Sequence, residues 1–201
     1  MPMKLAVCVS GRGSNLVALL EALRGSKEAQ VALVLSNRPE APALDQAREW
    51  GVPAESLSSY RDGSEWLERL KGHQVDLVVL AGYLKLVPPE VIRAYRGRIL
   101  NVHPALLPAF GGPGMYGHHV HRAVLASGAA QSGATVHLVD EEYDRGPILA
   151  QGRVPVLPGD TPESLAARVL EVEHRLLPET VLRAARAGHP VPLADPLESP
   201  A

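Results

Sequence analysis

The sequence has little cysteine and little aromatic residue content, and it has no long apolar run. A single cysteine, Cys8, among 201 residues excludes an internal disulfide framework and a cysteine-rich zinc site. No apolar stretch approaches the roughly 18 residues that span a bilayer, and no apolar segment with a small-residue cleavage site opens the chain. We therefore expect a soluble cytoplasmic protein with Cys8 in its core.

The sequence also lacks an excess of either charge. Its 20 Lys and Arg residues and 22 Asp and Glu residues give a formal net charge of −2, and the basic residues are spread along the chain. This distribution has no electrostatic footprint for nucleic acid or for an anionic membrane, so the expected partner is a small molecule. The length and the 46% share of apolar residues suffice for one substantial core.

Short apolar runs alternate with amphipathic segments along most of the chain. Continuous apolar runs are typical of strands in a parallel sheet, and apolar spacings of three and four are typical of helices. The expected strands are 4–9, 31–36, 75–82, 98–102, 133–140 and 147–156, and the expected helices are 15–24, 41–51, 64–72, 88–97, 118–128 and 161–186. This succession predicts a three-layer, doubly wound α/β fold with a mostly parallel sheet and a Rossmann-like N-terminal half.

The last expected helix has clear start signals. Thr161 is the expected N-cap, Pro162 occupies the first helical position, and Pro178 is expected to kink the helix. The Pro- and Ala-rich segment 189–201 has no periodicity, so we expect a mobile tail after a single domain, 1–188.

The segment SGRGSNL, residues 10–16, joins the first expected strand to the first expected helix. Gly11 and Gly13 allow a sharp turn, and the helix that Ser14 and Asn15 open has free N–H groups suited to a phosphate. Leu16 replaces the third glycine of a dinucleotide fingerprint, and the ending of a P-loop is missing. The alternative is an ordinary turn with Ser14 or Asn15 as N-cap.

The segment NVHPALLPAF, residues 101–110, follows an expected buried strand. In open parallel sheets, ligands bind at the carboxyl ends of strands. Side chains alternate along a strand, so Asn101 and His103 share a face. Each residue alone is often structural, but together they offer an oxyanion donor beside a titratable imidazole.

Two further clusters of titratable residues are candidates for function. Asp140, Glu141, Glu142 and Asp144 crowd one expected loop, where an acid could orient His103 and favour its protonated form; such acidic runs are equally often only solvated. His118, His119 and His121 lack a recognised metal-ligand spacing, so we expect them on a helix surface, with no metal.

These motifs together resemble the glycinamide ribonucleotide formyltransferase family of folate-dependent transformylases. The resemblance extends from VCVSGRGSNL through VVLAGYLKLVPPEVIRAYRGRILNVHPALLPAF and GMYGHHVHRAVLASG to GATVHLVDEEYDRGPILAQ. It implies transfer of a formyl group from 10-formyltetrahydrofolate to the amine of N1-(5-phospho-D-ribosyl)glycinamide in de novo purine (IMP) biosynthesis. It implies folate as a cosubstrate, no permanently bound cofactor or metal, and a monomer or homodimer.

The resemblance also implies site residues. It places nucleotide-phosphate binding in about residues 1–100, and folate binding and catalysis in about residues 101–188. Its catalytic residues match Asn101, His103 and Asp144. Its ribonucleotide site matches Gly13, Ser14, Asn15 and Glu173, and its folate site matches Arg61, Leu84, Lys85, Leu86, Val87, Asn101, Asp140, Glu141, Glu142, Tyr143 and Asp144.

One local departure and three other functions bear on this interpretation. Leu84 and Lys85 stand where the family usually has Met and Arg. The resemblance further implies a cis peptide between Leu107 and Pro108 beside the site. A formyltetrahydrofolate hydrolase is the main alternative, in which water replaces the amine. A transfer-RNA formyltransferase and a non-enzymatic nucleotide-binding module are the others, and the latter would not explain why Asn101, His103 and Asp144 occur together.

Overall fold

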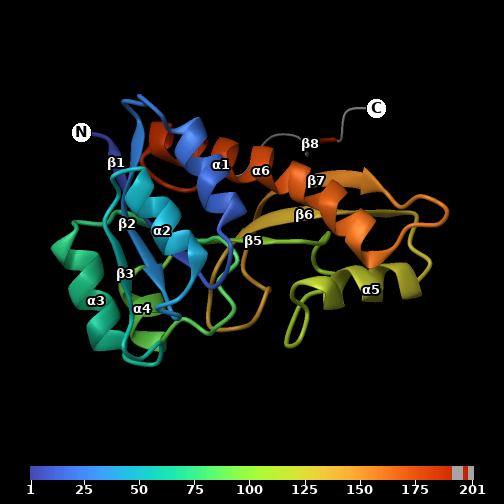
Figure 1. The fold of residues 1–201 in the computed structure, drawn as a ribbon, viewed down its shortest axis with the longest axis horizontal. Coiled ribbons are helices and arrows are strands. Elements are labelled where there is room, and N and C mark those ends of the chain that lie inside the picture. The colour runs from blue at the N-terminus through green and yellow to red at the C-terminus, as the bar shows by residue number, and fades with distance from the viewer. Residues whose placement is uncertain (192–196, 199–201) are drawn as a thin grey trace.

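The computed structural model describes residues 1–191 and, as a short strand, residues 197–198. Figure 1 shows one sheet flanked by helices. The strands are β1 (Met3–Val9), β2 (Ala29–Ser36), β3 (Ala54–Ser56), β4 (Leu77–Leu80), β5 (Ile99–His103), β6 (Gln131–Leu138), β7 (Ile148–Pro155) and β8 (Leu197–Glu198). The helices are α1 (Ser14–Ala22), α2 (Pro42–Glu49), α3 (Gly63–Gly72), α4 (Pro89–Ala94), α5 (His118–Ala126) and α6 (Pro162–Ala187).

The sheet has the strand order β3-β2-β1-β4-β5-β6-β7-β8. The five strands from β3 to β5 in this order are parallel to one another, whereas β6 is antiparallel to both β5 and β7. The chain builds outward from β1 to β3 and then returns to place β4 on the other side of β1. This reversal between β1 and β4 opens a crevice at the carboxyl ends of the strands, where doubly wound folds bind ligands. The predicted fold class is confirmed.

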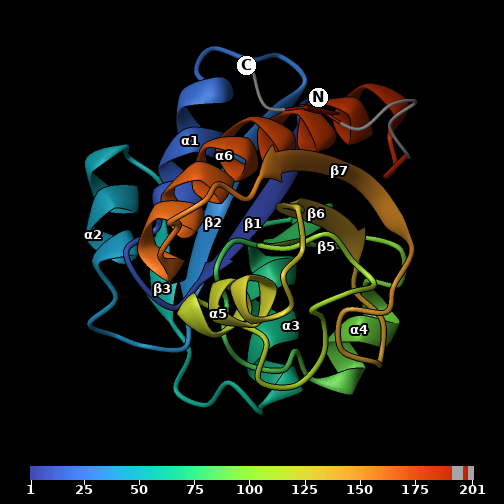
Figure 2. The same cartoon turned by 90° about the vertical axis from the view of Figure 1, so that its right-hand side faces the viewer.

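The alternation of side chains along β1 explains the three layers. Leu5 and Val7 point into the core beneath α1, α2 and α6, whereas Ala6 and Cys8 point into the core beneath α3 and α4. Figures 1 and 2 show α1 and α6 together on one face of the sheet. Cys8 is fully buried, as predicted, and its burial raises the pKa of the thiol. A buried thiol with a raised pKa is an inert packing group.

Several element boundaries differ from those expected. Strand β3 was not expected, because Ala54–Ser56 is only partly buried and carries no apolar pattern. Strand β4 is shorter than the expected 75–82, since the chain turns out of the sheet at Gly82, where φ is 74°. Helix α4 ends at Ala94 rather than at residue 97, and Tyr95 caps it.

Helix α6 begins where the sequence predicts. The Thr161 side chain accepts a hydrogen bond from Ser164 N at 3.2 Å, and Ser164 Oγ accepts one from Thr161 N at 3.0 Å, which completes a capping box. The helix continues through Pro178 to Ala187. Across the described part of the chain, no helix combines the length and apolarity needed to cross a membrane. Most of the tail expected to be mobile, 189–201, lies outside the described residues.

Candidate active site

The loop between β1 and α1 is held in a fixed shape from both sides. Ser10 Oγ donates to Asn37 Oδ1 at 2.5 Å and accepts from Leu84 N at 2.9 Å. Gly13 adopts φ 82°, and a Cβ added there would lie 2.6 Å from Ala43 Cβ. Only glycine therefore fits where the loop passes against α2. The loop leads directly into α1 at Ser14.

The N-terminus of α1 has no capping side chain. Its N-cap is Gly13, and no side chain accepts a hydrogen bond there. The first N–H groups of a helix lack partners within the helix, and they carry the positive end of its dipole. Ser14 lies at this end and lines a cleft of the molecule. The arrangement suits an anion, as the sequence predicts.

A buried pair links this helix end to α6. Asn15 Nδ2 donates to Glu173 Oε2 at 2.6 Å, and both residues line the cleft. Burial raises the pKa of Glu173 to about 7, and the hydrogen bond from Asn15 opposes that shift only in part. Asn15 Oδ1 is buried and has no hydrogen-bond partner among the described residues. The pair therefore combines a readily titrated carboxyl group with an unsatisfied acceptor.

Strand β5 carries Asn101 and His103 into the same cleft. Asn101 Nδ2 lies 3.0 Å from His137 Nε2 on the neighbouring strand β6. His137 Nδ1 lies 2.9 Å from the carbonyl oxygen of Leu138, to which it donates; in the tautomer that carries its only ring proton there, Nε2 accepts the amide hydrogen of Asn101. This contact orients the Asn101 side chain and leaves its second N–H free.

His103 is almost fully buried, with 3% of its surface exposed. Its Nε2 lies 2.8 Å from the carbonyl oxygen of Phe110, to which it donates, and its Nδ1 lies 3.7 Å from Asp144 Oδ2. Burial lowers the pKa of His103, while Asp144 and the Phe110 carbonyl raise it by less. Asp144 thus acts in the predicted direction, but the net shift favours a neutral imidazole, because burial outweighs it.

Asp144 sits at the centre of these contacts. Its Oδ1 lies 3.5 Å from His137 Nε2, and its Oδ2 accepts a hydrogen bond from Gly112 N at 2.9 Å. Burial alone would raise the pKa of Asp144, but His137, His103 and the Gly112 N–H together hold it below its ordinary value. Asp144 is therefore an ionised carboxylate beside two imidazoles.

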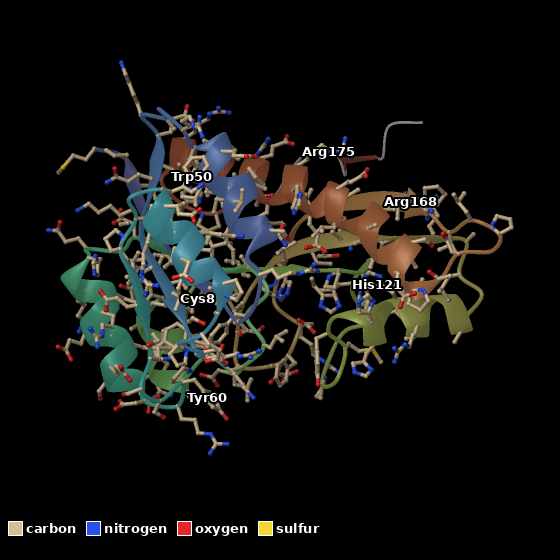
Figure 3. All side chains as sticks on the ribbon, viewed as in Figure 1. Cys8, Trp50, Tyr60, His121, Arg168 and Arg175 are labelled. Atoms are coloured by element: carbon tan, nitrogen blue, oxygen red, sulfur yellow. The ribbon has the colours of Figure 1, made fainter. Side chains whose placement is uncertain are left out.

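The three histidines of the GHHVHR segment divide between two environments. His118 and His119 are exposed on α5, as predicted. His121 is not a surface residue, because only 4% of it is exposed and it lines the cleft. Figure 3 shows its side chain among the sticks between α5 and α6. Burial lowers the pKa of His121 to about 4, and its Nδ1 has no hydrogen-bond partner among the described residues.

The cleft has a volume of about 640 Å³ and extends from α1 across β5 to the loop around Asp144. It brings together nearly all the residues that the sequence singled out. Ser14, Asn15, Leu84, Lys85, Leu86, Val87, Asn101, His103, Asp140, Glu141, Glu142, Tyr143, Asp144 and Glu173 line it. Its mouth holds Leu84 and Leu86, each about half exposed, and such exposed apolar side chains are typical of a ligand site.

Two predicted residues lie outside the lining of the cleft. Gly13 shapes the loop behind Ser14, and Arg61 lies beside Tyr60, with its guanidinium carbon 5.2 Å from the ring centroid. Lys85 Nζ approaches the same ring at 5.3 Å, so Arg61 is near the cleft without lining it. The described residues contain no group of three or more His, Cys, Asp or Glu side chains placed to hold a metal ion.

Several residues that line the cleft were not expected from the sequence to be site residues, among them Arg12, His121 and His137. Only the antiparallel register, in which His137 stands opposite Asn101, shows that the two meet. The Leu107–Pro108 peptide beside the site is cis, as predicted.

Comparison with known proteins gives a consistent assignment. The formyl transferase family model matches residues 3–181. A chloroplastic phosphoribosylglycinamide formyltransferase of Vigna unguiculata is 50% identical over 185 residues, which are 89% of this chain and 59% of that protein. The phosphoribosylglycinamide formyltransferase of Escherichia coli is 38% identical over 183 residues, covering 88% of this chain and 84% of that protein. The chain thus spans about six tenths of the Vigna protein and most of the bacterial one.

Solved structures agree with these matches. A phosphoribosylglycinamide formyltransferase from Anaplasma phagocytophilum superposes with a TM-score of 0.86 at 36% identity, over 93% of this chain and 89% of that one. A formyltetrahydrofolate deformylase from Pseudomonas syringae superposes with a TM-score of 0.82 at 26% identity, over 93% of this chain and 62% of that one. With a family model matching nearly its whole length and relatives of this identity, the chain belongs to the formyl transferase family.

Proposed function

We propose that the chain transfers a formyl group from 10-formyltetrahydrofolate to the amine of N1-(5-phospho-D-ribosyl)glycinamide, giving the N2-formyl product and tetrahydrofolate in de novo purine biosynthesis. The observation that carries the proposal is the single cleft that joins Asn101, His103 and Asp144 to the uncapped N-terminus of α1. An acyl-transfer apparatus beside an anion site fits a phosphorylated amine as acceptor. The relatives named phosphoribosylglycinamide formyltransferase support the same reaction.

The ribonucleotide would bind at the α1 end of the cleft. Gly13 shapes the loop, and Ser14 and Asn15 would offer N–H groups to the phosphate. The carboxyl group of Glu173 would contact the glycinamide end. A carboxyl with a pKa of about 7 ionises readily when an ammonium group arrives beside it.

The folate would occupy the opposite end of the cleft. Residues 84–87 and 140–144 line this end, and the exposed apolar side chains of Leu84, Leu86 and Tyr143 would cover the ring system. Arg61 and Lys85, which share the Tyr60 ring, would lie toward the acidic tail of the folate. Folate is needed as cosubstrate, and the proposed steps require no metal.

The transfer would begin when the amine attacks the formyl carbon and the carbonyl electrons move to oxygen. The free N–H of Asn101 would donate to this oxyanion, with the amide held by His137. Because burial favours neutral His103, its Nδ1 can accept the proton that the attacking nitrogen releases. Asp144, 3.7 Å away, would stabilise the imidazolium that forms. Collapse of the intermediate breaks the bond to the folate nitrogen, which takes the proton from His103.

Formyltetrahydrofolate hydrolysis is the second candidate, because the Pseudomonas syringae deformylase shares the fold at 26% identity. The folate absorbance change, followed with and without glycinamide ribonucleotide, separates the two reactions. Conversion that requires the ribonucleotide supports formyl transfer. Conversion at the same rate without it supports the hydrolase, and no conversion under either condition contradicts both enzymes.

A further inference from the structure

Arg12 is a charged residue of the cleft with no partner in the protein. It is exposed, it lies in the loop between Gly11 and Gly13, and it lines the cleft. No hydrogen bond or ion pair connects its guanidinium to any described residue, although most other cleft-side charges are near an opposite charge or a donor. A guanidinium offers five N–H donors in a planar fork, which matches a phosphate or a carboxylate.

The backbone around Arg12 is held in place by hydrogen bonds and packing, although its side chain has no partner among the described residues. Ser10, two residues before it, is bonded to Asn37 and to Leu84 N. Gly11 O accepts a hydrogen bond from Ala43 N at 3.2 Å, and Gly13 packs against Ala43. Arg12 therefore projects from a clamped loop, so little backbone entropy is lost when its side chain binds a ligand.

The charge balance of the cleft makes this guanidinium important for an anionic substrate. Six carboxyl side chains line the cleft: Asp140, Glu141, Glu142, Asp144, Glu163 and Glu173. Among the described lining residues, Arg12 and Lys85 are the only Lys or Arg, and Lys85 lies beside Tyr60 at the proposed folate end. A phosphate monoester carries about −1.5 to −2 charges at pH 7, so the carboxylates would repel it unless a cation stood at its site.

Among the described residues that line the cleft, the part of α6 that faces the N-terminus of α1 contributes no Lys or Arg. The α6 residues that line the cleft are Glu163, Ala166, Ala167, Leu170 and Glu173. Asn15, in the first turn of α1, is 93% buried, and its Oδ1 is an unpartnered acceptor at the cleft. An acceptor buried without a partner indicates that a donor on a ligand completes this end of the site.

We propose that Arg12 binds the 5-phosphate of the ribonucleotide together with the N-terminus of α1, and that it sets the preference of the enzyme for phosphorylated over unphosphorylated acceptors. The inference rests on the proposed function and extends it to a residue outside the matched Gly13, Ser14 and Asn15. Two N–H groups of the guanidinium donate to phosphate oxygens, and a hydroxyl group of the ribose lies toward Asn15. Asn15 Oδ1 then accepts from a sugar hydroxyl.

The test compares Arg12→Gln and Arg12→Lys with Arg96→Gln, which removes an exposed arginine that does not line the cleft. For Arg12→Gln we expect the KM for glycinamide ribonucleotide to rise about 10- to 100-fold, as for a lost charge-assisted hydrogen bond. The kcat and the KM for folate should change less than about twofold, because Arg12 contacts neither reacting group. Arg12→Lys keeps the charge without the planar fork of donors, so its KM for glycinamide ribonucleotide should lie between those of the parent and Arg12→Gln. Arg96→Gln should match the parent.

A second measurement separates this inference from the proposed reaction. Calorimetric titration with ribose 5-phosphate, and with ribose as the unphosphorylated control, needs no turnover. Ribose 5-phosphate binding that weakens at least tenfold in Arg12→Gln and persists in Arg96→Gln supports the role of Arg12, even if no formyl transfer occurs and the proposed function fails. Equal binding by the parent and Arg12→Gln, or no binding by the parent, overturns it.

Discussion

Asn15 and Glu173, 158 positions apart in the sequence, form a 2.6 Å hydrogen bond where the first turn of α1 meets the middle of α6. The bond is buried, and both of its residues line the cleft. It fixes the Asn15 amide so that Nδ2 is committed to the carboxyl group while Oδ1 remains available. The two ends of the chain thereby build one subsite.

Glu173 should make the protein less stable as pH rises. Its pKa of about 7 in the fold lies above that of an unfolded glutamate, so ionising it costs folding free energy between about pH 4.5 and pH 7. Glu173→Gln keeps an acceptor for Asn15 and removes this cost. We expect the unfolding free energy of the variant, relative to that of the parent, to rise by about 2 kcal/mol from pH 5 to pH 8. Urea unfolding of the variant and the parent at both pH values measures this change. If the difference in unfolding free energy between them is the same at pH 5 and pH 8, burial does not raise the pKa of Glu173.

Gly13→Ala should damage both the fold and the phosphate site. The new Cβ would lie 2.6 Å from Ala43 Cβ, and φ 82° is unfavourable for alanine. We expect a loss of about 1–3 kcal/mol in unfolding free energy and a raised KM for the ribonucleotide. Gly25→Ala is the matched control, because Gly25 has φ 71° and no atom within 4 Å of an added Cβ. Gly25→Ala should lower the unfolding free energy only by the cost of a positive φ for alanine, and it should leave the KM unchanged. Equal losses of unfolding free energy in the two variants would contradict a clash at Gly13.

His121 should make the fold sensitive to acid. Its pKa of about 4 in the fold lies below the unfolded value, so the unfolded chain takes up a proton first as pH falls below about 6.5. Stability is therefore fully present above that pH and is lost progressively down to about pH 4. From pH 7 to pH 5, we expect the unfolding free energy of His121→Gln to fall by about 2 kcal/mol less than that of the parent. The same comparison with His119→Gln, on the exposed face of α5, should show no difference from the parent.

Local patterns in the sequence suffice for most of the fold. The apolar runs at residues 4–9 and 31–36 correctly predict β1 and β2, and Thr161 and Pro162 correctly predict the start of α6. Local patterns do not predict the short strand β3, because its three half-buried residues have no periodicity and form a strand only by pairing with β2.

Some features of the site can also be predicted from local sequence, whereas others depend on contacts between residues far apart in the chain. Alternation along β5 predicts that Asn101 and His103 share a face. The partnership of Asn101 with His137 depends on strand register, and the neutral state of His103 depends on burial, so neither can be read from neighbouring residues. The three histidines lack a metal-ligand spacing, which predicts a helix surface for His121, but α5 packs beside the cleft and buries this residue.

His137 should act as a positioning residue for Asn101. Its Nε2, 3.0 Å from Asn101 Nδ2, holds the amide so that the second N–H faces the cleft. His137→Leu removes this acceptor, and we expect about a tenfold loss in kcat with little change in KM. His137→Gln, whose side-chain oxygen can accept the same hydrogen, should recover part of the loss. The double variant with Asn101→Ala should be no slower than Asn101→Ala alone; a further tenfold loss would indicate a separate role for His137.

His103 and Asp144 should act as a unit in turnover. His103→Ala should lower kcat by about 10²–10³, as should Asn101→Ala, because each removes a group that meets charge only in the transition state. Asp144→Asn should also act mainly on kcat, since it removes the carboxylate 3.7 Å from His103 Nδ1. The double variant of His103→Ala and Asp144→Asn should cost little more than His103→Ala alone.

The pH profile distinguishes this coupling from a purely structural effect of Asp144. In the parent, kcat/KM should fall at acid pH as His103 gains a proton and can no longer accept one from the amine. Asp144 raises the pKa of His103 against the opposing effect of burial, so Asp144→Asn should move this acid limb to lower pH. Asp45→Asn, which changes an exposed carboxylate on α2, should leave the limb in place. An unmoved limb in Asp144→Asn, together with multiplicative losses in the double variant, would mean that the two side chains act independently.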